Sequence, residues 1–331
     1  MDRLRIGILG AARIAPPALI KPARRVDDVE VTAVAARDSQ RARAFAGKHG
    51  IPVVHTGYDA LLADPDVDAI YNSLPNGLHG AWTLRAIEAG KHVLCEKPFT
   101  ANADEAAVVA EVAARSEVVV MEAFHYRYHP LTARLLEIIA SGEIGAVSHI
   151  ETSMCIPLLR RRDIRYDLSL AGGALMDVGC YTIHLLRTLA DAEPEVVDAT
   201  AAVSSPGVDR AATAHFRFAD GRSGRIQCAL LSGKPLALWA RVVGDRGQLR
   251  VRNPWAPQFF HRIVVKAGKA RRIEHVTRDP TYLFQLRAFA SAVLRNEPIL
   301  TGPDDAIANM RVIDAAYVAA GLEPRQPSAH G

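Results

Sequence analysis

The chain has 331 residues, more than one hydrophobic core usually organises, so we expect two domains. Hydrophobic residues make up 49% of the sequence and charged residues 23%, a globular composition that excludes intrinsic disorder. Forty Lys and Arg against thirty-six Asp and Glu leave a formal charge of +4, which is too small and too dispersed to indicate a nucleic-acid partner.

The first third of the chain alternates short apolar runs with helical patterns, which is typical of βαβ units and a parallel sheet. Strands are predicted over Leu4 to Leu9, Val29 to Ala35, Ala69 to Ser73, His92 to Cys95 and Val118 to Glu122. Helices are predicted to begin near Ala15, Ser39, Tyr58, Gly80 and Ala103. These elements predict a doubly wound dinucleotide-binding domain over residues 1–125.

The pattern changes after this point, and residues 126–331 are predicted to form a second, α+β domain. Six extended segments separated by turn signals indicate an antiparallel sheet. They are Val196 to Val203, Thr213 to Phe218, Gly224 to Leu231, Ala237 to Gly244, Gly247 to Val251 and Arg262 to Val265. Helices are predicted over Asp177 to Leu189, Tyr282 to Arg295 and Asp304 to Ala320, and the tail after Leu322 is predicted to fray.

A turn at the end of the first strand stands where a dinucleotide-binding fold carries G-x-G-x-x-G/A. It reads Gly10-Ala11-Ala12-Arg13-Ile14-Ala15. Ala12 takes the place of the middle glycine, so a simple tight turn is the alternative. If the turn binds a dinucleotide, the phosphates lie on backbone N–H groups at the following helix N-terminus.

The second strand ends at Arg37 and Asp38, where NAD enzymes place an acid against the ribose. A guanidinium here favours the 2′-phosphate of NADP, because it can bind phosphate through two hydrogen bonds. Asp38 keeps NAD as the alternative cofactor. A solvated loop is the other interpretation of Arg37 and Arg41.

Two further signals are proton-handling side chains. Lys97, within Glu96-Lys97-Pro98, follows a parallel strand at the edge where open α/β sheets bind ligands; a surface lysine paired with Glu96 is the alternative. Asp177, Tyr181 and His184 have i, i+4 and i+7 spacing, which places them on one helix face. We predict that this face meets a substrate, whereas three separate structural roles are the alternative.

These motifs, in this order, resemble the Gfo/Idh/MocA family of oxidoreductases over nearly the whole chain. The resemblance also rests on Asn72-Ser73-Leu74-Pro75-Asn76-Gly77-Leu78-His79, on Gly172-Gly173-Ala174-Leu175-Met176-Asp177 and on Met121-Glu122-Ala123-Phe124. Within the family the chain is most similar to the branch of dimeric dihydrodiol dehydrogenases and NADP-dependent D-xylose 1-dehydrogenases.

The resemblance implies a Rossmann domain, a second domain with an open, mostly antiparallel sheet, and hydride transfer between NAD(P) and a sugar, polyol or diol. It implies that Lys97, Tyr181 and Asp177 are catalytic and that His184, Arg165 and Phe124 bind the substrate. Together with the motifs it assigns cofactor binding to Gly10, Ala12, Arg13, Ile14, Ala15, Arg37, Asp38, Arg41, Ser73, Pro75, Asn76, His79, Glu96 and Lys97.

We expect the substrate hydroxyl to lie between Tyr181 and Lys97. A nearby ammonium lowers the pKa of a tyrosine from its usual value of about 10, which makes the phenol a usable base. Either group can accept the proton, since coupled groups share their titration. A non-catalytic dinucleotide-binding regulator of the same family is the alternative, but a pure sensor has no need of this pair.

The remaining sequence features bear on metal binding, on anion binding and on the cellular compartment. His125 with His129 and Cys180 with His184 have i, i+4 spacing but no third and fourth ligand, so we predict no metal. The run Arg160-Arg161-Arg162 is interpreted as a solvated loop, with anion binding as the alternative. Four sparse cysteines, no CxxC pair, no membrane-length apolar run and no signal-peptide pattern predict a cytoplasmic protein.

Assembly is predicted from the second domain's sheet. One face is expected to be covered by helices, and the other to carry apolar residues that need a partner, among them Leu230, Leu236, Leu238 and Trp239. We therefore predict a homodimer or a dimer of dimers.

Overall fold

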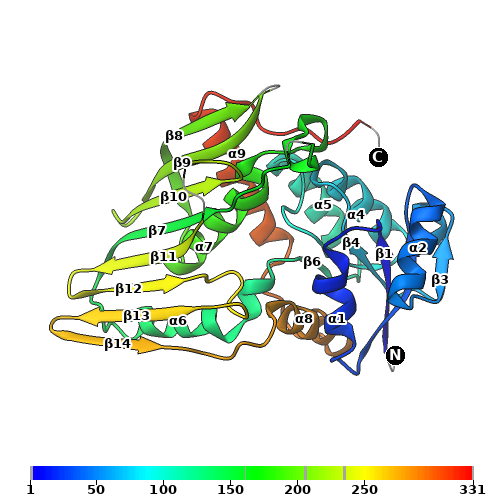
Figure 1. Ribbon diagram of the computed structural model, residues 1–331, viewed down its shortest axis with the longest axis horizontal. Helices are drawn as coiled ribbons and strands as arrows, with labels where there is room; N and C mark the ends of the chain where they lie inside the picture. Colours follow the sequence, from blue (N-terminus) through cyan, green and yellow to red (C-terminus); the bar gives the residue numbers. More distant parts are fainter. Residues whose placement is uncertain (1–2, 161, 205–206, 234–235, 330–331) are drawn as a thin grey trace. The chain divides into compact units, whose positions relative to one another are not determined.

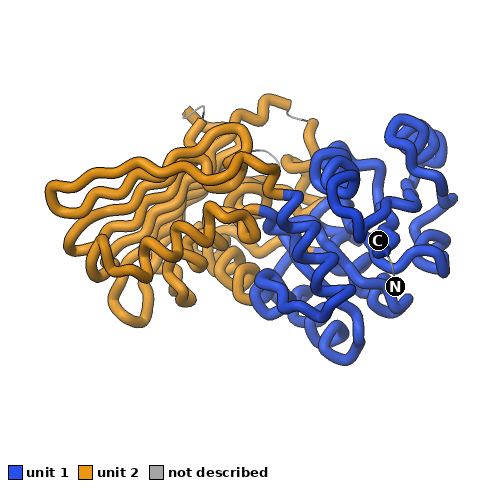
Figure 2. Tube along the Cα trace, turned by 90° about the horizontal axis from the view of Figure 1, so that it is seen from below, with its two compact units in different colours: residues 1–125, 282–307, 327–331 blue, residues 126–281, 308–326 orange. Residues whose placement is uncertain are grey.

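The computed structural model describes residues 3–160, 162–204, 207–233 and 236–329. The chain divides into two compact units, coloured separately in Figure 2. The first comprises residues 1–125, 282–307 and 327–331, and the second comprises residues 126–281 and 308–326. The first unit therefore includes a late stretch of the chain in addition to its first 125 residues.

The first unit is built on a six-stranded sheet in which every neighbouring pair is parallel. In order across the sheet the strands are β3 (Val53–His55), β2 (Val29–Ala35), β1 (Leu4–Leu9), β4 (Ala69–Asn72), β5 (His92–Cys95) and β6 (Val120–Glu122). The strand order reverses between β1 and β4, the point at which such sheets bind ligands beyond their carboxyl ends. The predicted doubly wound fold is confirmed; β3, a short half-exposed strand, was not predicted.

The helices of this unit connect the parallel strands, as Figure 1 shows. They are the π-helix η1 (Pro16–Ile20), α1 (Lys21–Ala23), α2 (Ser39–His49), α3 (Tyr58–Leu62), the 3₁₀ turn η2 (Asn76–Leu78), α4 (His79–Glu88) and α5 (Ala103–Ala114). After the 3₁₀ turn η3 (His125–Tyr128) the chain leaves the unit, and it returns for most of α8 (Thr281–Arg295). The Asn102 side chain caps α5 by accepting a hydrogen bond from the Glu105 N–H.

The second unit contains an eight-stranded sheet in which all neighbouring pairs are antiparallel except β7 with β10. Across the sheet the order is β14 (Ala270–Glu274), β13 (Arg262–Ala267), β12 (Gly247–Arg252), β11 (Ala237–Gly244), β7 (Val147–Cys155), β10 (Ser223–Ala229), β9 (Val208–Phe218) and β8 (Pro194–Ser204) (Figure 1). The mostly antiparallel sheet is confirmed. Two strands, β7 and β14, and the helix α6 (Pro130–Ala140) were not predicted from the sequence.

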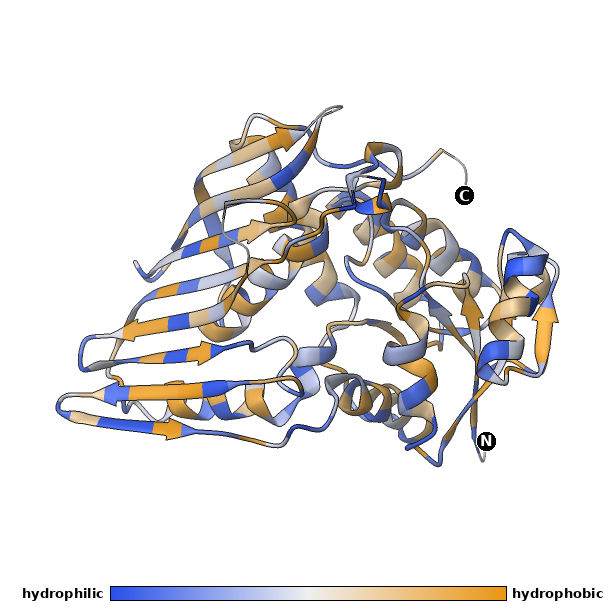
Figure 3. Ribbon diagram, viewed as in Figure 1, coloured by the Kyte–Doolittle hydropathy of each residue, from blue (hydrophilic) through white to orange (hydrophobic). Residues whose placement is uncertain are grey.

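One face of this sheet is covered by helices. The helix α7 (Cys180–Ala190) packs on β7 and β10, and α6 packs on β12. Hydrophobic and hydrophilic residues alternate along several strands (Figure 3), because successive side chains of a strand point to opposite faces. Ile150, Ile226 and Leu249 are buried on the helix side.

The opposite face, which we call the open face, is more polar than predicted. Trp239, Arg241 and Glu151 lie on it, and Arg241 pairs with Glu151 at 3.1 Å. Leu238 stands opposite Met154 and so belongs to the helix side, Leu230 is fully buried, and Leu236 precedes β11. Of the four apolar residues predicted to cover this face, the structure therefore places Trp239 on it.

Candidate active site

The turn after β1 crosses the carboxyl end of the parallel sheet at its switch point. Gly10 has a φ of +89°, and its N–H donates to the Ala35 carbonyl at 2.8 Å. A side chain at Gly10 would come within 3.2 Å of Leu74 and would require a strained backbone. The Ser73 hydroxyl, from the end of β4, donates to the Leu9 carbonyl at 2.8 Å and ties the two strand ends together. The turn thus has the position and backbone shape of a dinucleotide-binding loop.

Two exposed arginines follow β2, with Arg37 in the loop and Arg41 in the first turn of α2. The Asp38 carboxylate caps α2 by accepting hydrogen bonds from the Gln40 and Arg41 N–H groups at 2.8 and 3.1 Å. Arg41 donates to the Ala11 carbonyl at 2.9 Å, which places its guanidinium next to the turn. Arg37 is exposed at the strand end. Asp38 caps α2 through Oδ1 alone, and the two neighbouring guanidinium groups favour a phosphate ligand here.

Lys97 lies at the same edge of the sheet, directly after β5, and is half-buried. The preceding Glu96 donates its N–H to Asn72 at 2.9 Å and accepts the Tyr71 hydroxyl at 2.6 Å. The peptide bond from Lys97 to Pro98 is cis. These contacts fix the strand end from which the Lys97 side chain departs.

His79 holds the other side of this segment. Its Nδ1 lies 2.7 Å from the Pro98 carbonyl and its Nε2 lies 2.8 Å from the Leu74 carbonyl. Burial lowers the pKa of His79 to about 4, and the nearby Lys97 ammonium adds to this effect although the two carbonyls oppose it. At neutral pH the ring is therefore uncharged, and its single N–H donates to one of the two carbonyls while the ring packs between the loop after β4 and the Lys97 segment. Direct cofactor binding by His79, Pro75 and Asn76 stays a prediction.

In the second unit, the π-helix η6 (Leu175–Gly179) continues directly into α7 and carries the predicted polar face. Asp177, Tyr181 and His184 are all buried, with exposed fractions of 8%, 6% and 1%. The Tyr126 hydroxyl lies 2.5 Å from His184 Nδ1, and its ring centre is 6.1 Å from that of Tyr181. Since one side chain contacts both, Tyr181 and His184 share a helix face. Tyr126 was not predicted, because no spacing links it to α7.

Asp177 has a cationic neighbour in the same unit. Arg165, on the 3₁₀ turn η4 (Ile164–Tyr166), places its Nε 3.3 Å from an Asp177 carboxylate oxygen. The structure thus brings together two residues that the sequence analysis assigned separately, one to the substrate and one to catalysis. Phe124, also assigned to the substrate, is fully buried in the first unit.

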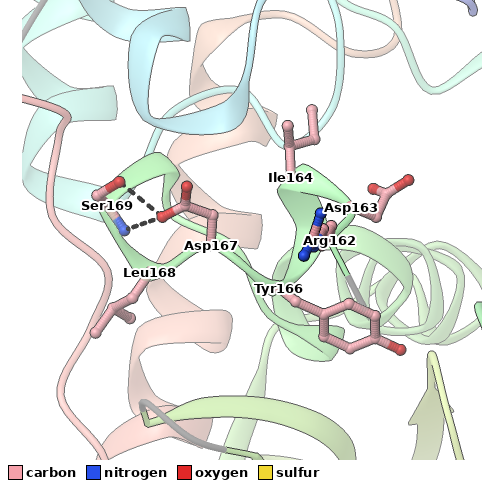
Figure 4. Close-up of a pocket in the computed structure, with 7 residues that line it drawn as sticks. All are labelled: Arg162, Asp163, Ile164, Tyr166, Asp167, Leu168 and Ser169. Atoms are coloured by element: carbon pink, nitrogen blue, oxygen red, sulfur yellow. Dashed lines mark hydrogen bonds between the residues drawn. The ribbon is translucent and has the colours of Figure 1, made fainter. Parts of the chain in front are cut away.

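The loop that carries Arg165 also encloses a hollow of about 660 Å³ (Figure 4). It is lined by Arg162, Asp163, Ile164, Tyr166, Asp167, Leu168 and Ser169. The hollow mixes one guanidinium with two carboxylates, so it has no single charge preference. Arg160 and Arg162 are exposed, as expected of a solvated loop, and Arg161 lies outside the described residues.

Comparison with known proteins decides the family. Residues 4–124 match the family model described as "Oxidoreductase family, NAD-binding Rossmann fold" (GFO_IDH_MocA), and residues 132–250 match the "GFO/IDH/MocA C-terminal domain". The chain is 37% identical over 320 residues to D-xylose 1-dehydrogenase (NADP(+)) 2 of Haloferax volcanii, covering 96% of this chain and 97% of that protein. The chain belongs to the GFO/IDH/MocA family.

Two further relatives of this GFO/IDH/MocA protein extend the comparison. Trans-1,2-dihydrobenzene-1,2-diol dehydrogenase of Mus musculus is 33% identical, over 77% of this chain and 76% of that protein. KijD10, a 3-ketoreductase from Actinomadura kijaniata solved in complex with NADP and TDP-benzene, is 28% identical, with a TM-score of 0.90 over 96% of this chain and 98% of that one. The predicted family, the oxidoreductase class and the Rossmann fold are confirmed.

The sequence pairs with metal-like spacing have other contacts in this GFO/IDH/MocA chain. His129 caps α6, with its Nδ1 accepting from the Leu131 N–H at 3.0 Å, and the His125 ring lies 4.1 Å from that of Tyr282. Within the described residues, no three His, Cys, Asp or Glu side chains are arranged to hold a metal.

In the part of the chain that the structure describes, no helix combines the length and hydropathy of a membrane span.

Proposed function

We propose that the protein is an NADP-preferring dehydrogenase or reductase that acts on the CH–OH or carbonyl carbon of a sugar, polyol or diol. The observation that supports this proposal is the buried polar pair Tyr181 and His184 on α7, both in contact with Tyr126, and the buried Asp177 on the preceding η6. Packing alone favours apolar side chains at such buried positions. A regulator that merely binds a dinucleotide needs neither these side chains nor Lys97.

The cofactor assignment is supported by the loop after β2. The exposed Arg37, with Arg41 held beside the Gly10 turn, can bind the 2′-phosphate of NADP, while Asp38 is engaged as the cap of α2. The names of the relatives agree with this choice, because the xylose dehydrogenase is named for NADP(+) and KijD10 was solved with NADP. NAD remains the alternative that the assay below tests.

The proton step is assigned to this chain's own side chains. The nicotinamide, when bound, exchanges hydride with the substrate carbon. In the oxidative direction the hydroxyl proton passes to Tyr181 or Lys97, and in reduction the same group returns it. Asp177, held by Arg165, orients the substrate or the lysine, and His184 binds a second hydroxyl. KijD10 has been solved with one tyrosine changed to phenylalanine and with one lysine changed to alanine or glutamate, so these two residue types have been targets of mutation in a relative.

The test is the absorbance of the nicotinamide band while aldoses, inositols and vicinal diols are offered with NADP and then with NAD. We expect turnover with members of one of these classes and faster turnover with NADP. Tight NADP binding without turnover on any of them would favour the regulator. Equal turnover with both nucleotides would remove the NADP preference but leave the enzyme.

We also propose that two copies pair through the open face of the eight-stranded sheet. Trp239 lies on this face with Arg241 and Arg250, residue types that are enriched in protein interfaces, and Arg250 lies over the Trp239 ring at 5.5 Å. A twofold axis would let this patch meet its own copy. Light scattering is expected to give a mass of two or four chains of 35.8 kDa, and a monomeric mass at micromolar concentration would contradict the pairing.

A cytoplasmic location is part of the same proposal. Its support is that the four cysteines, all within the described part of the chain, form no disulfide and are buried.

A further inference from the structure

A buried ionic cluster lies where the chain enters η6. Arg325, beyond α9 (Pro303–Ala319), and Asp209 on β9 form an ion pair with 2.6 Å between Nη2 and Oδ1. Their side chains are 5% and 0% exposed. The prediction of a frayed tail after Leu322 is therefore wrong at Arg325, which is as buried as a core residue. A guanidinium and a carboxylate removed from water in this way are costly unless each is fully partnered.

Both members of the pair also bind the backbone that leads into η6. Arg325 Nε donates to the Gly172 carbonyl at 2.9 Å, and Asp209 Oδ2 accepts from the Leu175 N–H at 2.7 Å. Tyr317, on α9, donates its hydroxyl to Asp209 at 3.0 Å, and its ring lies 4.3 Å from the guanidinium carbon. The cluster thus makes hydrogen bonds to both ends of the turn of residues 172–175.

Gly173 makes this close approach feasible. Its φ is +147°, and a Cβ at this position would lie 2.1 Å from Asp209 and 2.6 Å from the Tyr317 hydroxyl. The Gly173 carbonyl accepts the Asp177 N–H at 3.0 Å. The turn held by the cluster is therefore the first turn of the helical segment that carries Asp177 and, one turn later, Tyr181.

We propose that Arg325 is a positioning residue for the reaction: paired with Asp209, it fixes the turn of residues 172–175 and so sets where Asp177 and Tyr181 stand, without itself touching the substrate. The inference rests on the proposed function, because it presupposes that these two side chains act on the substrate. A displacement of about 1 Å in a group that must be aligned can slow a reaction about a hundredfold. A loosened turn is therefore expected to reduce kcat.

The experiment compares Arg325→Met with a matched control, Arg187→Met, in the full-length protein. Arg187 is also a buried arginine of the second unit, with a side chain 7% exposed, and it pairs with Glu193 at 2.7 Å. It lies near the end of α7, away from the turn of residues 172–175. Both variants remove a buried guanidinium and leave an aliphatic stem. Arg325→Met removes the hydrogen bond to the Gly172 carbonyl, whereas Arg187→Met removes the ion pair with the Glu193 side chain.

Two readouts decide the matter. Amide hydrogen exchange of peptides within residues 172–179 is expected to quicken about tenfold or more in Arg325→Met and to stay at the wild-type rate in Arg187→Met. With NADP and the best substrate of the panel, kcat is expected to fall about tenfold to a hundredfold in Arg325→Met, whereas the Kd for NADP changes less than about threefold. Unchanged exchange, unchanged kcat, or an equal loss of kcat in both variants would overturn the inference.

Arg325→Lys provides the milder variant if the methionine protein does not fold. Lysine keeps the charge opposite Asp209 but offers one nitrogen in place of the two that reach Asp209 and Gly172. We expect exchange and kcat between those of the wild type and Arg325→Met, and wild-type values in both would overturn the inference. Absence of turnover in the wild type on every substrate would instead overturn the proposed function, and hydrogen exchange would still decide whether Arg325 fixes the turn.

Discussion

The two units hold the side chains proposed to transfer the proton by different physical means. In the first, the Lys97 segment is fixed by hydrogen bonds of the backbone and by the uncharged ring of His79 between two carbonyls. In the second, the segment with Asp177 and Tyr181 is bounded by ion pairs, from Arg165 to Asp177 and from Arg325 to Asp209. The first segment is held by hydrogen bonds to backbone groups, to the Glu96 carboxyl and to an uncharged ring, whereas the second is bounded by ion pairs.

This difference makes the two regions respond to different perturbations. Acid lowers the stability of a region that holds a buried neutral histidine. The unfolded chain takes up a proton at this histidine more readily than the folded chain does, so protonation favours the unfolded state. A buried ion pair is insensitive to salt but fails when one partner is removed, because the other charge is left without compensation. The half-exposed Arg165 is screened by solvent and should contribute least.

The largest expected effect comes from removing one proton-handling group from each region. Lys97→Met and Tyr181→Phe should each lower kcat about a hundredfold to ten-thousandfold, the usual contribution of a positioned acid or base. The double variant should be scarcely slower than the slower single one, since groups acting as a unit are strongly non-additive. Steady-state kinetics with NADP checks this. Full activity in Tyr181→Phe would transfer the role to Lys97 or His184, and full activity in both single variants would favour the regulator.

The next effect belongs to the first unit alone. Arg37→Ala should weaken NADP binding about tenfold to a hundredfold and leave NAD nearly unchanged, because a charge-assisted pair with phosphate contributes about 1.5 to 3 kcal/mol. Fluorescence titration with each nucleotide measures the two Kd values. Arg43→Ala, an arginine on the helix α2 that follows, is the control and should alter neither. An equal loss for both nucleotides in Arg37→Ala would contradict the assignment to the 2′-phosphate.

Acid should reduce the contribution of the uncharged His79 ring to the free energy of unfolding. The folded pKa of His79 is about 4, below the usual value near 6.5, so its contribution to stability is complete above about pH 6.5 and is lost as the pH falls toward 4. At pH 5 this loss amounts to about 2 kcal/mol of the free energy of unfolding. Urea unfolding at pH 7 and pH 5 should show a smaller decrease for His79→Asn than for the wild type. His215→Asn, an exposed histidine, should behave as the wild type; an identical decrease in all three proteins would refute the account of His79.

The smallest expected effect concerns the exposed ion pair of the second unit. Arg165→Ala should raise the substrate KM or lower kcat about twofold to fivefold, in keeping with a partly solvated pair, and added salt should reduce the difference. Arg162→Ala, on the same loop and exposed, serves as the control and should match the wild type. A loss of a hundredfold in Arg165→Ala would show that Arg165 contacts the substrate during the reaction rather than supporting Asp177.

The fold was predictable where burial leaves a simple pattern. The strands β1 and β2 are buried on both faces of a parallel sheet, so their apolar runs marked their bounds. The central strand β7 was missed because it lies between helix α7 and the polar open face, and its His149 and Glu151 broke the apolar pattern. The helix α6 was missed although it begins at a proline, a common first helical residue.

The candidate site was predictable where its residues share one element. The spacing of Asp177, Tyr181 and His184 was enough to find a continuous helical segment, although the structure divides it between the π-helix η6 and α7. Tyr126 and Arg325 were not found, because each meets that helix from a distant part of the chain and neither leaves a periodic signal. Long-range partners of this kind depend on the tertiary fold and have no local pattern in the sequence.

The most direct test of the central claim is isotope transfer. The experiment uses the aldose, polyol or diol of the panel that is turned over fastest. This substrate is prepared with deuterium at the reacting carbon and is incubated with NADP and the wild-type protein. The account predicts that the nicotinamide band grows and that mass spectrometry finds one deuterium in each reduced nucleotide. Reduced nucleotide without deuterium, or no reduction of NADP or NAD by any substrate of the panel, would contradict it.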